Sequence, residues 1–370
     1  MKALAAVLHQ SGKPLSVEEV EVLPPGPGEV QVRIKAAGVC HSDLHVIKGD
    51  LPMPTPIIPG HEGAGIVEAV GKGVTEVAEG DHVLPMWRMS CGRCEYCLGG
   101  KPALCDVGTK MRFSGLMPDG KTRFRSSSGK QILHYAGVST FSQLATMPEA
   151  AVVKIPQDYP LNKGALISCG VITGFGAVVN TARVSPGDTV AIFGCGGIGL
   201  NIVQSAKIAG ARRIIAVDRV SKKLEFARQF GATETINASE DDPVEAIMDL
   251  TGTGVDYAFE AVGLPEPIEQ AYDSTKKGGT CVVVGIAPRE ARAKINVNAL
   301  VYAEKTLKGT IYGSMRPRID LLRLIDLHLS GQLELDKLLT KTYPLTEINE
   351  AYADLEAGKV ARSLLLPNGE

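Results

Sequence analysis

A run of closely spaced cysteines is the part of this sequence best suited to chemistry. Cys91, Cys94, Cys97 and Cys105 form a C-x2-C-x2-C-x7-C pattern that uses half of the eight cysteines in the chain. Thiolates this close together can converge on one tetrahedral Zn²⁺ and leave no open position, as in a structural zinc site. Two disulfides are the alternative, although nothing else in the sequence is typical of a secreted protein.

A second set of metal-binding residue types is spread more widely. Cys40 and Cys169 lie far apart in the chain, on either side of the pair His61-Glu62. Taken singly, a buried cysteine is usually a core residue and a lone histidine is usually a satisfied polar group. Two thiolates and an imidazole together can hold a catalytic zinc with its fourth position open. Asp43 could orient His61 through the second ring nitrogen, and Glu62 is either a transient ligand or an electrostatic neighbour.

A glycine-rich segment predicts a dinucleotide site. It reads Gly194-Cys195-Gly196-Gly197-Ile198-Gly199. The segment follows a predicted strand and opens a predicted helix, and Asp218 ends the next predicted strand, which is the context that this motif requires. The glycines let a pyrophosphate approach the helix N-terminus. We expect NAD rather than NADP, because the Asp218 carboxylate binds ribose hydroxyls and repels a 2′-phosphate, although the neighbouring Arg219 could tolerate one.

Composition limits the classes of partner. A net charge of −2 over 370 residues argues against nucleic acid, which requires a concentrated positive surface. No apolar run reaches the roughly 18 residues of a membrane span. The N-terminal MKALAAVLHQ lacks a cleavage-site pattern and is predicted to be a first β-strand rather than a signal peptide. We therefore expect a cytoplasmic protein with reduced thiols.

The pattern of apolar residues changes along the chain. The first third has short alternating runs broken by Gly and Pro, typical of an irregular, mainly antiparallel β domain, and residues 106–138 are predicted to be a long loop-rich lobe. From about residue 186, continuous apolar strands alternate with helices, which predicts an α/β, doubly wound parallel sheet. The predicted strands are 189–193, 213–218, 233–236, 255–260 and 280–285, and the predicted helices are 200–209, 221–230, 242–251 and 267–277. A last strand is predicted at 361–366, so residues 171–310 form a coenzyme domain inserted between 1–170 and 311–370 of one catalytic domain.

Several of these segments resemble one family over almost all of the chain. They are GVCHSD (38–43), GHEGAG (60–65), CGRCEYC (91–97) with Cys105, GTK, LMPDG and RF within 108–124, STFSQ (139–143), SCGVITGFG (168–176) and GCGGIG (194–199). The combination is similar to the zinc-dependent medium-chain alcohol dehydrogenases, and most similar to the branch with the class I and class III enzymes.

The resemblance implies a GroES-like, mainly β catalytic domain that carries both zinc sites, and a Rossmann NAD-binding domain. It implies an oligomer in which coenzyme domains pair through a strand near 306–313, with a homodimer expected and a tetramer as the alternative. It also implies individual roles: catalytic-zinc ligation by Cys40, His61 and Cys169, a proton relay through Ser42 and His45, a nicotinamide contact by Thr173, and pyrophosphate contacts by His41 and Arg362.

The predicted activity is reversible hydride transfer between a primary or secondary alcohol and NAD⁺, with two Zn²⁺ per chain. The alternative is a class III enzyme that oxidises S-(hydroxymethyl)glutathione. Class III enzymes grip that substrate with an arginine at the position of Thr109, although Lys110 or Arg112 could substitute, and the acidic residues of the entrance are reduced to Asp50. A zinc-lacking reductase would not need the cysteines, and a zinc-finger module or a non-enzymatic NAD-binding scaffold would not need the full set of motifs.

Overall fold

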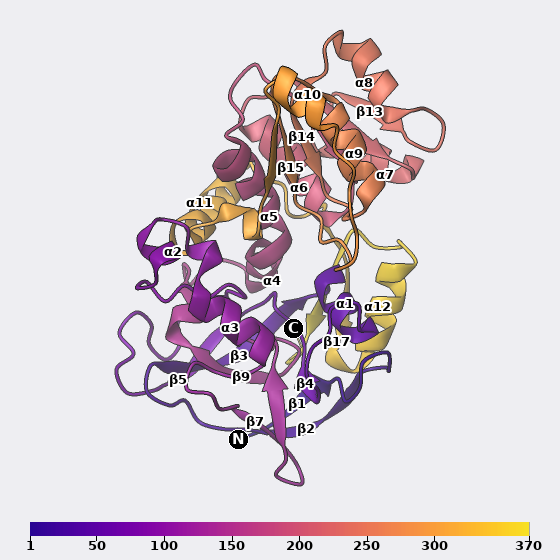
Figure 1. The fold of residues 1–370 in the computed structure, drawn as a ribbon. Helices are drawn as coiled ribbons and strands as arrows, with labels where there is room; N and C mark the ends of the chain where they lie inside the picture. The colour runs from indigo at the N-terminus through magenta and orange to yellow at the C-terminus, as the bar shows by residue number, and fades with distance from the viewer. Residues whose placement is uncertain (370) are drawn as a thin grey trace. The chain divides into compact units, whose positions relative to one another are not determined.

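The chain separates into two compact units in a computed structural model, which describes residues 1–369. The first unit comprises Met1–Cys169, Arg316–Asp326 and Leu335–Glu370, and the second comprises Gly170–Met315 and Leu327–Glu334 (Figure 1). Residues 311–315 and 327–334 therefore belong to the second unit, whereas the sequence analysis assigned them to the catalytic domain.

Two sheets build most of the first unit. The five-stranded sheet has the order β1-β2-β7-β8-β4 and the larger one the order β10-β6-β5-β3-β18-β17, with β9 paired to β3. Their strands are β1 (Lys2–Val7), β2 (Ser16–Val22), β3 (Glu29–Gly38), β4 (Ile57–Ile58), β5 (Ala64–Val70), β6 (His82–Pro85), β7 (Phe124–Ser126), β8 (Gln131–His134), β9 (Leu144–Pro148), β10 (Val152–Lys154), β17 (Leu339–Pro344) and β18 (Arg362–Leu366). Most pairs are antiparallel, as predicted for this part of the chain, and the N-terminal residues form the predicted strand β1.

Helices of the first unit connect these strands. They are α1 (His41–Lys48), α2 (Glu95–Leu98), α3 (Asp106–Ser114), α4 (Leu161–Leu166), α12 (Ile348–Glu356) and most of α11 (Pro317–Leu329). Helix α3 and the β7–β8 hairpin contradict the loop-rich lobe predicted for 106–138. The helix was obscured by Gly108, where a Cβ would lie 2.3 Å from the Met89 carbonyl oxygen, so glycine is required by packing rather than by a loop.

One long helical segment contradicts the expectation that no apolar segment is as long as a membrane span. Residues Leu161–Ala182 form 22 residues of helix with a mean hydropathy of 1.6, which is long and apolar enough to span a membrane by composition. The segment contains α4, a π-helical stretch Ile167–Val171, α5 (Ile172–Gly176) and a second π-helical stretch Ala177–Ala182. Because 83% of its apolar window is buried inside the protein, it has the character of a core helix.

The second unit is a parallel six-stranded sheet of order β13-β12-β11-β14-β15-β16. The strands are β11 (Thr189–Phe193), β12 (Arg213–Asp218), β13 (Glu234–Asn237), β14 (Val255–Glu260), β15 (Thr275–Val283) and β16 (Thr306–Gly309). The remaining helices are α6 (Gly197–Ile208), α7 (Ser221–Phe230), α8 (Pro243–Thr251), α9 (Pro265–Asp273) and α10 (Val297–Tyr302). Helices α6 and α7 pack on each other and on β11–β13, and α8 packs on α9, which covers β14 and β15 (Figure 1).

Burial at the centre of this parallel sheet explains why its strands could be predicted from the sequence. All five residues of β11 are buried, because the strand is covered on both faces. The doubly wound prediction is confirmed, and β11, β12, β14 and α7 have the predicted bounds. The edge strand β16 is shorter than the predicted 306–313, since Tyr312, Gly313 and Ser314 take positive φ values in a turn.

Candidate active site and metal centres

Four buried side chains from separate segments meet in the first unit. Cys40 follows β3 and begins α1, His61 and Glu62 lie between β4 and β5, and Cys169 lies in the π-helical stretch. One potential ligand atom from each residue lies within 4.8 Å of all the others. Neither cysteine is in a disulfide. The structure thus brings together the widely spaced residues that the sequence analysis proposed as one group.

Glycines make room for this convergence. Gly60 has a φ of 90°, which an L side chain rarely adopts, and it turns the chain so that His61 and Glu62 point inward. At Gly38, a Cβ would lie only 1.9 Å from Oε2 of Glu62. The space for the Glu62 carboxylate therefore exists because residue 38 has no side chain.

His61 is held between a carboxylate and a thiol. Its Nδ1 lies 2.9 Å from Oδ2 of Asp43, as predicted, and its Nε2 lies 3.2 Å from Sγ of Cys169. Asp43 is fixed in turn by the Gly60 amide, which donates to Oδ1 at 3.0 Å. Burial lowers the pKa of His61, but Asp43 and the Cys40 sulfur outweigh this effect and hold the pKa well above its usual value. The pKa of Cys40 is lowered, first by a hydrogen bond from Cys169 and then by His61.

Glu62 forms a buried ion pair with Arg362, a residue of β18. Burial raises the pKa of Glu62 to about 7, against the opposing charge of Arg362. The second oxygen, Oε1, has no hydrogen-bond partner and lies 3.9 Å from Nε2 of His61. The contact with Glu62 was not foreseen, because Arg362 was predicted only as a pyrophosphate ligand.

The donor set fits Zn²⁺. Two thiols and an imidazole are the ligand types of an open zinc site, and the partnerless buried oxygen of Glu62 is beside them. Buried polar atoms without partners are rare, so this oxygen is itself an indication that a cation belongs here.

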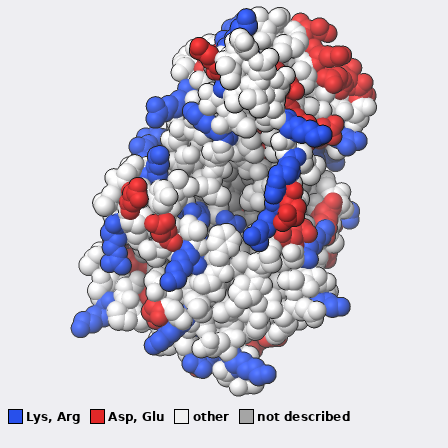
Figure 2. Space-filling view, viewed as in Figure 1, with Lys and Arg blue, Asp and Glu red and all other residues white. Residues whose placement is uncertain are grey.

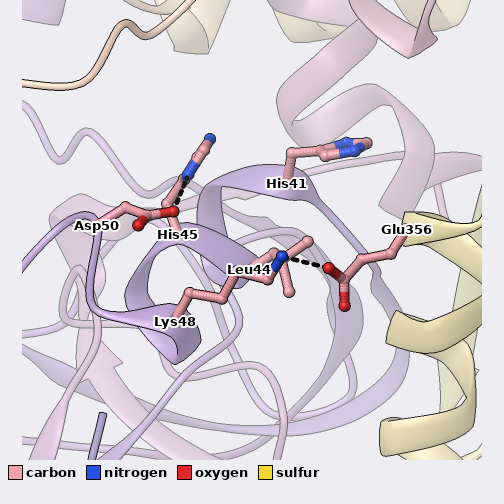
Figure 3. Close-up of a pocket in the computed structure, with 6 residues that line it drawn as sticks. All are labelled: His41, Leu44, His45, Lys48, Asp50 and Glu356. Carbon is pink, nitrogen blue, oxygen red and sulfur yellow. Dashed lines mark hydrogen bonds and ion pairs between the residues drawn. The ribbon is translucent and has the colours of Figure 1, made fainter. Parts of the chain in front are cut away.

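The predicted relay residues lie on α1, next to this group. The Ser42 hydroxyl oxygen is 3.7 Å from Sγ of Cys40, and Nδ1 of His45 is 3.1 Å from Oδ2 of Asp50. Together with Lys48, His45 and Asp50 line a cavity of about 250 Å³ whose other lining residues are His41, Leu44 and Glu356 (Figure 3). Lys48 forms an ion pair with Glu356 across it. The sequence analysis did not predict the contact between His45 and Asp50. The one feature of the sequence that indicates it is Gly49, which ends α1 with a positive φ and turns the chain back toward His45.

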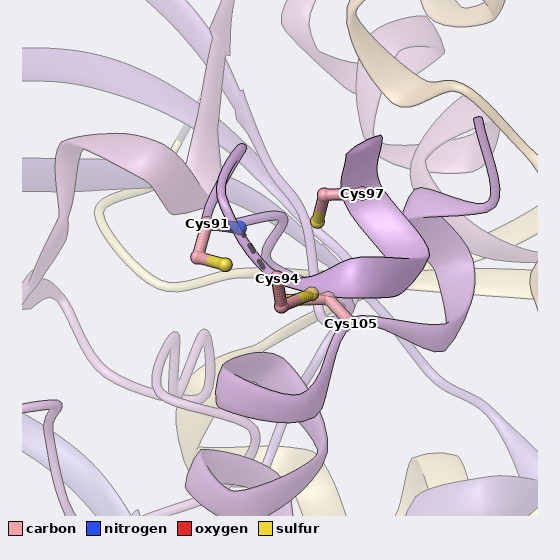
Figure 4. A group of neighbouring side chains, drawn as sticks. All are labelled: Cys91, Cys94, Cys97 and Cys105. Carbon is pink, nitrogen blue, oxygen red and sulfur yellow. Dashed lines mark hydrogen bonds between the residues drawn. The ribbon is translucent and has the colours of Figure 1, made fainter. Parts of the chain in front are cut away.

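The four clustered cysteines also converge. Cys91, Cys94, Cys97 and Cys105 offer sulfur atoms within 4.8 Å of one another, and all are free, which contradicts the disulfide alternative (Figure 4). Amides of Cys97 and Asp106 lower the pKa of Cys94 to about 6, so the local backbone stabilises a thiolate. The Cys91 amide donates to Sγ of Cys105 at 3.3 Å. Such a set of thiolates suits a closed, tetrahedral zinc site.

The glycine-rich segment has the geometry of a phosphate-binding turn. It begins after β11 with Gly194, whose φ is 95°, and it opens α6 at Gly197, with Gly196 and Ile198 beside that helix start. A Cβ on Gly199 would lie 1.7 Å from the Gly194 carbonyl oxygen, so the close approach requires glycine. Asp218 ends β12, and its two oxygens accept hydrogen bonds from the amides of Cys195 (2.8 Å) and Val220 (3.0 Å).

Two further predicted cofactor residues lie in the same unit. Arg219 is exposed after β12, and Thr173 is buried on α5. Neither has a contact in the structure that assigns it to a cofactor, so their roles stay predictions.

A mainly β unit with two sets of zinc-ligand residue types, and a doubly wound unit with a dinucleotide turn, define a zinc-binding dehydrogenase. Comparison with known families agrees: residues 26–157 match the alcohol dehydrogenase GroES-like domain, and residues 197–327 match the zinc-binding dehydrogenase domain. The chain belongs to the zinc-dependent medium-chain alcohol dehydrogenase family.

Full-length relatives support this assignment. The chain is 42% identical to the NDMA-dependent alcohol dehydrogenase of Amycolatopsis methanolica, with 100% of both chains covered. It is 42% identical to the class-3 alcohol dehydrogenase of Dictyostelium discoideum, covering 98% of this chain and 97% of the relative. The crystal structure of benzyl alcohol dehydrogenase from Acinetobacter calcoaceticus is 35% identical, with 99% of both chains covered and a TM-score of 0.94.

Proposed function

We propose that the chain is a cytoplasmic, NAD-dependent zinc alcohol dehydrogenase that interconverts primary or secondary alcohols with aldehydes or ketones. The observation that carries the proposal is the convergence of Cys40, His61 and Cys169 beside the partnerless oxygen of Glu62. These three residues hold the catalytic zinc, and Cys91, Cys94, Cys97 and Cys105 hold a structural zinc. A bound catalytic zinc polarises the substrate oxygen and favours its deprotonation.

Residues of α1 transfer the proton of the substrate alcohol toward solvent. The Ser42 hydroxyl is beside Cys40 and can accept the proton of the alcohol, and His45 can deliver it to solvent because 38% of its side chain is exposed. Asp50 supports this role, since its hydrogen bond fixes the orientation of the His45 ring. Glu62 supplies a buried carboxyl group next to the zinc ligands, and the ion pair with Arg362 favours its charged form against the effect of burial.

The cofactor is held by the second unit. The pyrophosphate of NAD is expected at the N-terminus of α6, over Gly196, Gly197 and Gly199. Asp218 already faces the glycine turn, so the adenosine ribose is expected there, with Arg219 beside it. By resemblance, Thr173 contacts the nicotinamide, and His41 and Arg362 contact the pyrophosphate. The hydride chemistry belongs to the cofactor.

The activity is tested by following NADH absorbance with a panel of primary and secondary alcohols. We expect turnover with NAD⁺ that is lost when zinc is removed and returns when zinc is restored. Because a relative is NDMA-dependent, the same panel is measured with NDMA as the acceptor. Turnover only with NDMA would keep the alcohol chemistry but exclude exchange of soluble NAD⁺, and no turnover with either acceptor would contradict the proposal.

The class III alternative depends on what replaces its substrate-gripping arginine. The Thr109 hydroxyl accepts a hydrogen bond from Arg88 at 2.9 Å and donates one to the Cys105 carbonyl at 2.9 Å, so it is occupied within the lobe. We expect kcat/KM for hydroxymethylglutathione to lie below that for hexanol or benzyl alcohol, by about tenfold to a hundredfold, the size of a lost arginine–carboxylate contact. A preference of more than about tenfold for the glutathione adduct would reverse this assignment.

The second unit is proposed to dimerise through β16. This strand is the edge of the parallel sheet, and its Leu307 is 42% exposed. The preceding α10 exposes Val297, Val301 and Tyr302. An uncovered apolar edge is an aggregation hazard, and pairing with a second copy removes it. Light scattering is expected to give the mass of a dimer, or of a tetramer as the alternative, and a monomer would contradict the shared edge.

A further inference from the structure

The segment that carries His61 and Glu62 belongs to no helix or strand. Residues 59–63 lie between β4 and β5, so strand pairing does not hold their backbone in place. Hydrogen bonds from other parts of the first unit do so instead. The Gly60 amide donates to Asp43, and the Gly60 carbonyl accepts from the Thr140 amide at 3.0 Å. Buried backbone groups outside regular structure need such partners.

One peptide group of this segment is held on both sides by side-chain hydroxyls. The Glu62 carbonyl accepts a hydrogen bond from Oγ1 of Thr140 at 2.7 Å. The amide of the next residue, Gly63, donates to Oγ of Ser168 at 3.0 Å. Both groups belong to the single planar peptide unit between Glu62 and Gly63. The two hydroxyls therefore fix the orientation of that plane, and with it the position of the Glu62 Cα.

Ser168 connects this peptide to the helical segment that carries Cys169. Its hydroxyl also donates to the Ala165 carbonyl at 2.8 Å. A hydroxyl has one donor and two acceptor lone pairs, so it can form both bonds at once. Ser168 directly precedes Cys169 in the π-helical stretch Ile167–Val171, and such stretches are frequent at functional sites. One hydroxyl thus joins the segments of two proposed zinc ligands, which are far apart in the sequence.

Thr140 occupies space that two glycines leave open. A Cβ on Gly60 would lie 2.7 Å from Oγ1 of Thr140, and a Cβ on Gly63 would lie 2.8 Å from its Cγ2. Thr140 therefore packs against both ends of the segment with His61 and Glu62. The side chains of Thr140 and Ser168 are fully buried, so water does not compete for their hydrogen bonds.

We propose that Ser168 and Thr140 are positioning residues of the candidate catalytic metal site. By fixing the peptide between Glu62 and Gly63, they set the placement of His61 relative to Cys169. Ligands that are held in place lose less conformational freedom when they bind, which favours binding. This inference rests on the proposed function and adds two residues that are not themselves ligands. The competing explanation is that the hydroxyls only satisfy buried backbone groups and stabilise the fold.

Metal binding separates these explanations without turnover. The zinc-containing protein is exposed to a chelator, and the release of zinc is followed in time. The same proteins are loaded with Co²⁺, whose visible absorption depends on the geometry of its ligands. The spectrum of Cys40→Ala, which keeps the four clustered cysteines, is subtracted so that the difference reports on the catalytic group.

The variants remove each hydroxyl in turn. They are Ser168→Ala and Thr140→Val, and Thr140→Ser keeps the hydroxyl in a smaller side chain. Ser274→Ala is the matched control, because Ser274 is fully buried in the second unit and its hydroxyl donates to the Gln270 carbonyl at 2.7 Å. The face drawn in Figure 2 carries both acidic and basic side chains, and no variant changes a charge, so the approach of an anionic chelator is the same for all.

We expect Ser168→Ala and Thr140→Val to release the catalytic zinc about tenfold faster than the unaltered protein, because loss of contacts around the ligands weakens metal sites by about tenfold to a hundredfold. Both variants should also shift the Co²⁺ difference spectrum. Thr140→Ser should restore the release rate and the spectrum of the unaltered protein, and Ser274→Ala should leave both unchanged.

Release rates and spectra that match those of Ser274→Ala would overturn the inference, even where the thermal midpoint falls, since a purely structural role lowers the midpoint alone. An equal effect of Thr140→Ser and Thr140→Val would also overturn it, because shape rather than the hydroxyl would then be responsible. Thr140→Val changes the volume little, so it provides the test if Ser168→Ala does not fold. Failure of the proposed function looks different: metal retention then depends on the two hydroxyls while no alcohol is oxidised.

Discussion

Nδ1 of His61 lies 2.9 Å from Oδ2 of Asp43, and both side chains are buried. The other ring nitrogen of His61 faces Cys169, so the carboxylate fixes which nitrogen is directed at the metal group. Partners of this kind orient metal-binding histidines and raise their basicity. We predict that Asp43→Asn weakens zinc binding at this site by about tenfold to a hundredfold.

The measurement is zinc loss from the protein against increasing chelator, with Asp336→Asn as the control. Asp336 is an exposed carboxylate paired with Lys163 in the same unit. Equal zinc retention by both variants would show that Asp43 has no part in metal binding.

Loss of the proposed catalytic zinc and loss of the proposed structural zinc should have different effects on activity and stability. We predict two zinc ions per chain in the purified protein and one in either Cys40→Ala or Cys97→Ala. Cys97→Ala should lower the thermal midpoint strongly, because a closed structural site contributes folding free energy. Cys40→Ala should abolish turnover with a smaller change in midpoint. Metal analysis that finds one zinc or none in the unaltered protein would contradict the pair of sites.

The spacing of apolar residues along the chain predicted those strands and helices whose burial leaves a regular pattern in the sequence. Strand β11 was readable because burial on both faces demands a continuous apolar run, and α7 because its apolar residues recur with helical spacing. The metal groups were predicted because Cys and His in these numbers have few other uses. The ion pair of Arg362 with Glu62 could not be predicted, since the two residues are 300 positions apart and only the pairing of β18 with β3 brings them together.

Two helices were not predicted from the pattern of apolar residues, because packing in the folded protein determines them. Helix α3 contains Gly108, which in isolation indicates a loop, but the glycine is required by contact with Met89. Polar residues interrupt the helix at 161–182. Its high mean hydropathy is therefore recognised only when it is averaged over the full length of the helix, which the sequence analysis did not predict. At Gly108 a tertiary contact outweighed the local preference, and in the helix at 161–182 burial of 83% of the apolar window did so.

Cofactor choice should depend on Asp218. Its carboxylate is held by the amides of Cys195 and Val220, so it cannot turn away from a 2′-phosphate without losing two hydrogen bonds. We predict a strong preference for NAD⁺ over NADP⁺ in kcat/KM, and a smaller preference in Asp218→Ala because the repulsion is removed. Equal use of both cofactors by the unaltered protein would mean that Arg219 outweighs the carboxylate.

Acid stability should reflect His134, a fully buried residue of β8. Its Nε2 accepts a hydrogen bond from the Arg123 amide at 2.9 Å, and its Nδ1 has no partner. Burial, followed by the charge of Arg123, lowers its pKa from 6.5 to about 3. Between these two values the unfolded chain binds a proton that the folded protein does not, so the free energy of unfolding falls as the pH falls.

The size of this effect follows from linkage. One group of this kind changes the free energy of unfolding by at most about 1.4 kcal/mol per pH unit. We predict that His134→Gln is less stable than the unaltered protein at neutral pH, because the packing against Phe124 is lost. The difference between the two proteins should shrink as the pH falls from about 6.5 toward 4. Urea unfolding of both proteins across this range measures it, with His9→Gln as the control because His9 is exposed. A constant difference at every pH would show that the His134 ring titrates alike in the folded and unfolded states.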